Sequence, residues 1–190
     1  MTGYPLPVVG FCAFSGTGKT TLLTHLLPLL KERGLRIGVV KHAHHLFDID
    51  QPGKDSYELR RAGADQMLVA SRNRMARIEE FRTPRNEPSL EESLSALDPN
   101  RLDLVLVEGF KHERYPKIEL HRPDLGRPLL FLSDPDIIAI ATDTPAVNPG
   151  NHLPVLDLNQ PDEIADFIQR WILNPSSRDR KIHSLKEISI

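Results

Sequence analysis

The chain has 190 residues, 39% of them apolar and 26% charged, and a formal net charge of −2. These values are typical of one globular domain and lack the basic excess of a nucleic-acid-binding protein. No apolar run approaches the ~18 residues of a membrane-spanning helix, and the first residues lack the basic and apolar regions of a secretory leader. The single cysteine, Cys12, excludes an internal disulfide, so we expect a cytoplasmic protein with no membrane or nucleic-acid partner.

The first part of the chain predicts a strand, a glycine-containing loop, a helix and a second strand. Residues 6–14 form a continuous apolar run, as in a strand buried on both faces. Residues 20–33 repeat leucine at helical spacing, with Pro28 as a possible kink and Gly34 as the C-terminal stop. Residues 36–41 predict the next strand. This order indicates a βαβ unit with parallel strands and a right-handed crossover.

The rest of the chain continues the alternation of strands and helices. Helices are predicted over residues 56–62, 88–97 and 162–173, the first of them capped by Asp55 or Ser56. Strands are predicted over residues 66–71, 75–81, 102–107, 117–121, 129–132, 137–141 and 155–158, the last at a sheet edge. The pattern predicts an α/β fold, a P-loop NTPase-like three-layer sandwich with a mainly parallel central sheet and helices on both faces. We expect this domain to span residues 1–174, followed by a mobile polar tail over residues 175–190.

The loop between the first strand and helix has the composition of a phosphate-binding P-loop. It reads Ser15-Gly16-Thr17-Gly18-Lys19-Thr20. Backbone N–H groups of such a loop surround phosphate oxygens, and the helix N-terminus adds partial positive charge. Lys19 is expected to reach the β- and γ-phosphates, and the Thr20 hydroxyl to bind Mg²⁺. Ala13 stands where the usual pattern has its first glycine, which is compatible with the turn only if the backbone there suits a residue with a Cβ.

A P-loop site also needs an acidic residue that holds Mg²⁺ or orients water. Glu108 directly follows the apolar residues 104–107, at the strand end where α/β sheets place ligands. Asp48 and Asp50, in the polar loop after the second strand, are the alternative acids, or else solvated loop residues. For the base, Asp143 follows a late strand as in many guanine-binding proteins, but their accompanying lysine is missing. A plain turn starting at Asp143 is an equal alternative.

Three histidines, His42, His44 and His45, follow the second predicted strand. A histidine cluster is able to bind a transition metal, but no cysteine or carboxylate with an obvious ligand spacing accompanies this one. Contact with phosphate or with a partner, and a plain surface loop, are the favoured alternatives.

Three longer runs extend these motifs: SGTGKTTLL, KHAHHLFDIDQPGKDSYELRRAGADQ and LDLVLVEGFKHERYPKIEL. Together they resemble the MobB family, the molybdopterin-guanine dinucleotide biosynthesis adapter proteins, over nearly all of residues 6–172. The segment 41–64 is the most distinctive part, and Ala13 is compatible with the family. The polar tail lies beyond the resemblance.

The resemblance implies a protein that binds GTP with Mg²⁺ and hydrolyses it only weakly. It implies an accessory role beside the MobA-type transferase that joins GMP to molybdopterin, and a homodimer in which strands extend the sheet across the interface. The phosphate role then falls to Gly16, Thr17, Gly18, Lys19, Thr20 and Thr21. Glu108 matches the family's Glu-Gly-Phe-Lys segment as the acid on the Mg²⁺ side, and the neighbouring residues 110–113 are candidates to face the nucleotide.

Two other functional classes remain open. A small-molecule or nucleoside kinase would need an arginine lid over the transferred phosphate, for which Arg72, Arg74 and Arg77 are the candidates, although they fall on or beside a predicted strand. A purely structural adapter would have a vestigial nucleotide site, against which the intact Lys19 and Thr20 argue.

Overall fold

The computed structural model describes residues 4–43, 47–83, 85–144 and 153–174, which fall into two compact units. One unit comprises Met1–His42 and Ser89–Ile190, and the other comprises Ala43–Pro88. The predicted domain, residues 1–174, includes the described residues of both units. The predicted mobile tail, residues 175–190, lies outside the described residues.

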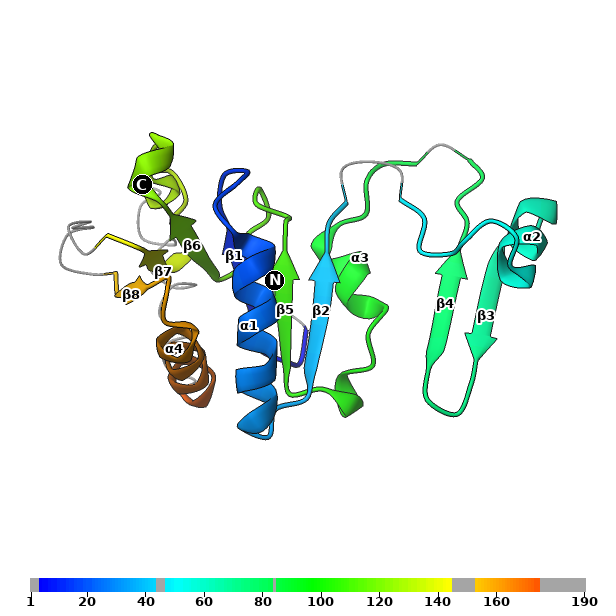
Figure 1. Ribbon diagram of the computed structural model, residues 1–190, viewed down its shortest axis with the longest axis horizontal. Helices are drawn as coiled ribbons and strands as arrows, with labels where there is room; N and C mark the ends of the chain where they lie inside the picture. The colour runs from blue at the N-terminus through cyan, green and yellow to red at the C-terminus, as the bar shows by residue number, and fades with distance from the viewer. Residues whose placement is uncertain (1–3, 44–46, 84, 145–152, 175–190) are drawn as a thin grey trace, which may run out of the picture. The chain divides into compact units, whose positions relative to one another are not determined.

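A six-stranded parallel sheet forms the centre of the first unit (Figure 1). Its strand order is β2-β5-β1-β6-β7-β8, and every neighbouring pair is parallel, which confirms the predicted α/β fold class. The strands are β1 (Val8–Cys12), β2 (Ile37–Lys41), β5 (Leu104–Glu108), β6 (Lys117–His121), β7 (Ile137–Thr142) and β8 (Val155–Asp157). As predicted, the last strand lies at the sheet edge. The strand that leads into the glycine loop therefore has a neighbour on each side.

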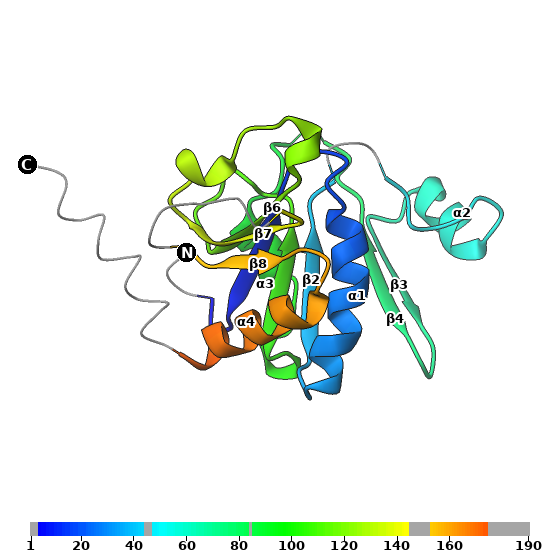
Figure 2. The ribbon, with the colours of Figure 1, turned by 60° about the vertical axis from the view of Figure 1, so that its left-hand side comes forward.

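Helices cover both faces of this sheet. Figures 1 and 2 show α1 (Lys19–Glu32) and α4 (Pro161–Leu173) on one face and the short α3 (Leu90–Ser95) on the other. Alternate strand residues pack on opposite faces, as the pleat requires: Val9 joins the apolar cluster of α1 and α4, and its neighbour Val8 joins that of α3. The protein is therefore a three-layer sandwich of the P-loop NTPase type.

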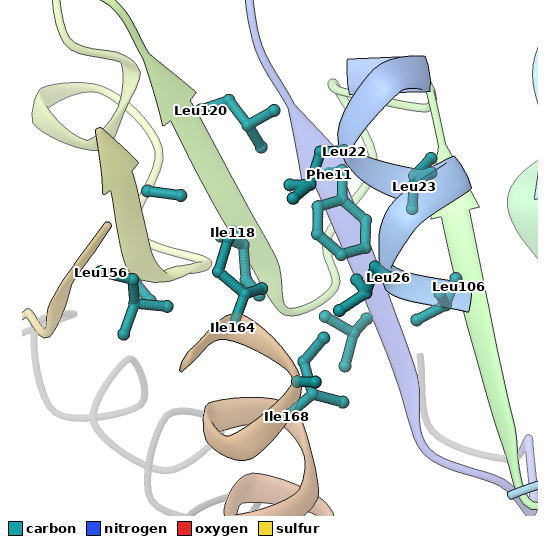
Figure 3. Close-up of a cluster of buried hydrophobic side chains, with 14 of the residues drawn as sticks. Phe11, Leu22, Leu23, Leu26, Leu106, Ile118, Leu120, Leu156, Ile164 and Ile168 are labelled. Atoms are coloured by element: carbon teal, nitrogen blue, oxygen red, sulfur yellow. The ribbon is translucent and has the colours of Figure 1, made fainter. Parts of the chain in front are cut away.

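The larger core lies between the sheet, α1 and α4 (Figure 3). Phe11 of β1 is fully buried there, beside leucines of α1 and isoleucines of β6 and α4. The leucine spacing of α1 places Leu22, Leu23, Leu26 and Leu30 in this core. Packing of this apolar stripe holds the start of α1, and with it the loop before it, in a fixed place on the sheet.

The C-terminus of α1 ends as the sequence predicts. Gly34 adopts a positive φ of 83°, its N–H donates to the carbonyl of Lys31, and the N–H of Leu35 donates to that of Leu30. These two hydrogen bonds form the Schellman motif, which favours glycine because a residue with a Cβ is strained at positive φ. Pro28 lies inside the helix, which continues past it to Glu32.

The second unit contains α2 (Asp55–Ala62) and an antiparallel hairpin of β3 (Gln66–Ala70) and β4 (Met75–Glu79). The N-cap of α2 is Lys54, so the prediction of Asp55 or Ser56 at this position was wrong. The Ser56 hydroxyl instead donates to the Asp50 carboxylate at 3.0 Å, while Asp55 lies in the first turn of the helix.

A second prediction was also wrong, because residues 129–132 do not form a strand. Leu130–Leu132 is a short 3-10 helix whose first two N–H groups, those of Leu130 and Phe131, donate to the Glu119 carboxylate at 2.7 and 2.9 Å. A short apolar run does not distinguish a strand from a helical turn. Here the buried Glu119 carboxylate needs hydrogen-bond donors, and the helical turn provides two N–H groups. Burial also raises the pKa of Glu119.

Candidate functional site

The candidate site lies at the carboxyl ends of the parallel strands, where α/β sheets bind ligands. The glycine loop follows β1, Glu108 ends β5, Arg122 follows β6 and Asp143 follows β7. In Figure 1 the arrowheads of β2 and β5 mark this edge of the sheet. Strand order therefore gathers these residues around the loop, although they are far apart in the sequence.

The loop has the backbone of a phosphate cradle. Gly16 and Gly18 adopt positive φ angles of 84° and 97°, and a Cβ at either position would meet nothing within 4 Å. Glycine is thus needed at both positions for backbone conformation rather than for space. Gly18 is also the N-cap of α1, with no side-chain cap, so the helix N-terminus opens onto the loop.

Side chains of the loop divide into one buried residue and several exposed ones. Thr17 is 2% exposed, and its hydroxyl donates to the Phe14 carbonyl at 2.8 Å, which ties the turn together. The exposed side chains are those of Ser15, Thr20 and Thr21. The substituted position, Ala13, packs against the larger core and is not among the described residues with positive φ, so its Cβ fits the turn without strain.

Lys19 lies over the loop. Its ammonium donates to the Ala13 carbonyl at 3.1 Å and to the Phe14 carbonyl at 3.5 Å. The positive charge is therefore held at the rim of the cradle by two neutral acceptors. An anionic phosphate is a stronger acceptor for an ammonium than a carbonyl is, so the contact is exchangeable.

Glu108 lies between a hydroxyl and an ammonium. The Thr20 hydroxyl donates to its Oε1 at 3.4 Å, and Lys41 Nζ lies 3.4 Å from its Oε2. The strand registers explain this, since Glu108 pairs with Phe11 of β1 on one side and with Lys41 of β2 on the other. Hydroxyl and carboxylate oxygens suit Mg²⁺, which in nucleotide sites takes one or two protein oxygens and completes its shell with phosphate and water. The two residues predicted to hold Mg²⁺, Thr20 and Glu108, are thus brought together.

The chain directly after Glu108 is bent and tightly packed. Gly109 has φ 104°, and a Cβ there would lie 2.6 Å from His42 Cβ. Phe110, with φ 51°, is the one non-glycine residue with positive φ in the described part of the chain. Its ring stacks on the His42 imidazole, with centroids 4.5 Å apart, and is buried in the smaller core. Phe110 is therefore packed into the smaller core and is not exposed for contact with a nucleotide.

Arg122 lies at the candidate site but was not among the residues predicted from the sequence. Its Nε donates to the Thr17 carbonyl at 3.1 Å, and its Nη1 donates to the Asp143 carboxylate. This guanidinium therefore joins the glycine loop to the acid that follows β7. A basic residue directly after a parallel strand was the available signal, but only strand order shows that β6 adjoins β1.

Most of the other candidate residues belong to the second unit or lie outside the described residues. Asp48 and Asp50 belong to the second unit, where both pair with the buried Arg60. Arg77 is in β4, and Arg72 and Arg74 are in the turn region of the same hairpin. Of the three histidines, His44 and His45 lie outside the described residues. Within the described ranges, no three His, Cys, Asp or Glu side chains form a group that could hold a metal, and no helix is long and apolar enough to cross a membrane.

Comparison with known proteins gives consistent matches. The family model for molybdopterin guanine dinucleotide synthesis protein B (MobB) matches residues 8–143. The molybdopterin-guanine dinucleotide biosynthesis adapter protein of Escherichia coli (strain K12) is 48% identical over 169 residues, covering 88% of this chain and 94% of the relative. The protein of the same name from Haemophilus influenzae is 41% identical over 167 residues, covering 88% and 90%.

Solved MobB structures are similar to this chain in fold. The crystal structure of Bacillus subtilis MobB superposes with a TM-score of 0.65 at 26% identity, covering 88% of this chain and 98% of that one. The MobB homologue of Bacillus stearothermophilus gives a TM-score of 0.62 at 27% identity, covering 87% and 97%. Sequence and fold therefore agree that the chain belongs to the MobB family.

Proposed function

We propose that this protein binds GTP with Mg²⁺ at the glycine loop and acts as an accessory protein in the synthesis of molybdopterin guanine dinucleotide. The loop geometry supports the phosphate part of the proposal, with Lys19 at its rim and Thr20 3.4 Å from Glu108. The printed names of its relatives, biosynthesis adapter proteins for the guanine dinucleotide, support the pathway. The observation that carries the proposal is the convergence of loop, lysine and acid at one strand edge.

The proposed roles follow from the chemistry of each group. Backbone N–H groups of residues 15–21 face the phosphates, Lys19 neutralises the terminal phosphates, and the Thr20 hydroxyl and Glu108 carboxylate face Mg²⁺. Bound Mg²⁺ would bridge phosphate oxygens and screen their charge. The sequence offered Asp143 for the base, and this carboxylate accepts a hydrogen bond from Arg122.

The protein holds the nucleotide for a partner and is at most a weak GTPase. The partner is the MobA-type transferase that attaches GMP to molybdopterin, and the adapter role consists of assisting that transfer. Formation of the guanine dinucleotide by the transferase should increase when this protein is added. An equal increase with Lys19→Ala would mean that nucleotide binding at the loop has no part in the assistance.

A homodimer is part of the same proposal. The hairpin of the second unit is a two-stranded sheet, which is marginally stable alone, and it carries Leu68, Val69 and Met75 at 57%, 44% and 71% exposure. Each strand of this two-stranded sheet has one edge without a neighbouring strand in the sheet, and such an edge with exposed apolar side chains suits pairing with a second copy. Light scattering should give a dimer mass for the wild type and a monomer mass for Leu68→Glu. A wild-type monomer at micromolar concentration would contradict the dimer.

Calorimetric titration with GTP and with ATP, each with and without Mg²⁺, tests which nucleotide the protein binds. We expect GTP to bind more tightly than ATP, and Mg²⁺ to strengthen binding of both. Equal affinity for GTP and ATP would remove the guanine assignment, and no binding of either would remove the nucleotide site.

A further inference from the structure

Arg122 makes two contacts that join separate parts of the sheet edge. Its Nε donates to the backbone carbonyl of Thr17 at 3.1 Å, and its Nη1 donates to the Asp143 carboxylate. The Arg122 side chain is 35% exposed and that of Asp143 is 23% exposed, so water screens the pair only in part. Charge-assisted hydrogen bonds of this kind are stronger than neutral ones.

The contact with Thr17 fixes the orientation of a loop peptide. The described residues contain no cis peptide bond, so the carbonyl of Thr17 and the N–H of Gly18 point in opposite directions. Because Arg122 holds the carbonyl on its own side, it turns the Gly18 N–H away from itself. Gly18 lacks a Cβ and permits many conformations, so the contact with Arg122 adds a constraint that the residue itself does not supply.

The segment after β6 is itself held against the loop. The His121 ring is within hydrogen-bond distance of the Arg127 carbonyl, 3.1 Å from Nε2. The Arg127 guanidinium lies 5.6 Å from the centroid of the Phe14 ring, at the start of the loop. The segment that carries Arg122 is therefore held in place by contacts of its own.

The Asp143 carboxylate accepts hydrogen bonds from two side chains. Its Oδ2 accepts from Arg122, and its Oδ1 accepts from the Thr144 hydroxyl at 3.4 Å. An acid that recognises guanine needs its carboxylate oxygens for the N1–H and amino donors of the base. Here each carboxylate oxygen already accepts a hydrogen bond, and one of the two donors is the guanidinium that also contacts the glycine loop.

We propose that Arg122, oriented by Asp143, is a positioning residue that sets the phosphate loop for any triphosphate, whatever its base. The inference rests on the proposed phosphate role of the loop. It assigns Asp143 to the support of Arg122 rather than to the base. Loss of either side chain should therefore weaken the binding of a nucleotide and of a base-free triphosphate by the same factor.

The test compares GTP with inorganic tripolyphosphate, both with Mg²⁺, on the full chain. Arg122→Ala should weaken both ligands by the same factor, about tenfold, the size of one lost charge-assisted hydrogen bond. Arg122→Lys should recover part of the loss, because an ammonium is able to donate to the Thr17 carbonyl but not to form the same fork. Asp143→Ala should weaken both ligands equally, and in the Arg122→Ala background it should have no further effect.

Arg114→Ala is the matched control. Arg114 pairs with Asp136 at 2.6 Å just before β6, at the opposite end of that strand from Arg122. This variant also removes an arginine–carboxylate pair, but the pair lies at the end of β6 away from the glycine loop. It should therefore leave affinity for both ligands unchanged. Thermal unfolding of each variant separates a loss of fold from a loss of positioning, and if Arg122→Ala does not fold, Arg122→Lys and Asp143→Asn decide the matter.

Three results would overturn the inference. In the first, Arg122 variants bind both ligands as the wild type does. In the second, Asp143→Ala weakens GTP but not tripolyphosphate. In the third, Asp143→Asn gains affinity for XTP, because an amide donor facing the xanthine carbonyl is the mark of a base-reading position. Failure of the wild type to bind either ligand would instead reject the proposed function, so the two failures are distinguishable.

Discussion

Glu108 lies where a hydroxyl, an ammonium and a strand end meet, and the proposed Mg²⁺ site depends on this carboxylate. Thr20 Oγ1 and Lys41 Nζ lie 3.4 Å from its two oxygens. Glu108→Gln keeps the shape but removes the charge that attracts a hard cation. We expect this variant to lose most of the affinity gain that Mg²⁺ gives to GTP, while binding without Mg²⁺ changes little.

Glu32→Gln, at the other end of α1, is the control for Glu108→Gln and should keep the full Mg²⁺ effect. Titrations of GTP at several Mg²⁺ concentrations make the comparison. An undiminished Mg²⁺ effect in Glu108→Gln would remove this residue from the metal side of the site.

Asp103 provides a pH-dependent test of stability at the residue scale. It forms an ion pair with Arg36, whose guanidinium and backbone N–H lower the Asp103 pKa from 3.8 to about 2. Because the folded pKa lies below the unfolded one, the stabilisation is present above about pH 4 and is lost as pH falls towards 2. Urea unfolding should show wild type more stable than Asp103→Asn at about pH 6, with the difference shrinking at about pH 2. A difference that is independent of pH would contradict the assignment.

At the scale of elements, the placement of α1 on the sheet decides the geometry of the loop. Leu26 of α1 is fully buried in the larger core, whereas Leu173 at the end of α4 is 73% exposed. Leu26→Ala should lower the free energy of unfolding by about 2–5 kcal/mol, because it removes buried methyl groups and leaves a cavity. Leu173→Ala should change it by less than about 0.5 kcal/mol. Chemical denaturation measures both, and equal effects would mean that this core does not hold the helix.

Most elements of the first unit were predictable because their sequences carry strong local signals. The apolar runs of β1 and β5, the leucine spacing of α1 and the glycine at its end each specify one structure. Residues 129–132 were not predictable, since a short apolar run fits a strand or a helical turn. The deciding partner, the Glu119 carboxylate, is distant in the sequence.

For the whole molecule, strand order carries the information that the sequence lacks. Motifs made the loop, Lys19, Thr20 and Glu108 candidates because each follows a recognisable strand. Arg122 was missed because its place beside the loop depends on β6 lying next to β1, and no local pattern contains that pairing. The buried Arg60, with its partners Asp48, Asp50 and Glu80, was likewise hidden in a segment that looked merely polar.

The most direct test of the account is the affinity of the wild type and of Lys19→Ala for GTP with Mg²⁺, measured by calorimetry beside Lys31→Ala. Both lysines belong to α1, but Lys19 lies at the loop and Lys31 in the last turn. We predict that Lys19→Ala weakens binding by at least about 1.5 kcal/mol, about tenfold, and that Lys31→Ala binds as the wild type does. Equal affinity of all three proteins for GTP would show that the glycine loop is not the nucleotide site.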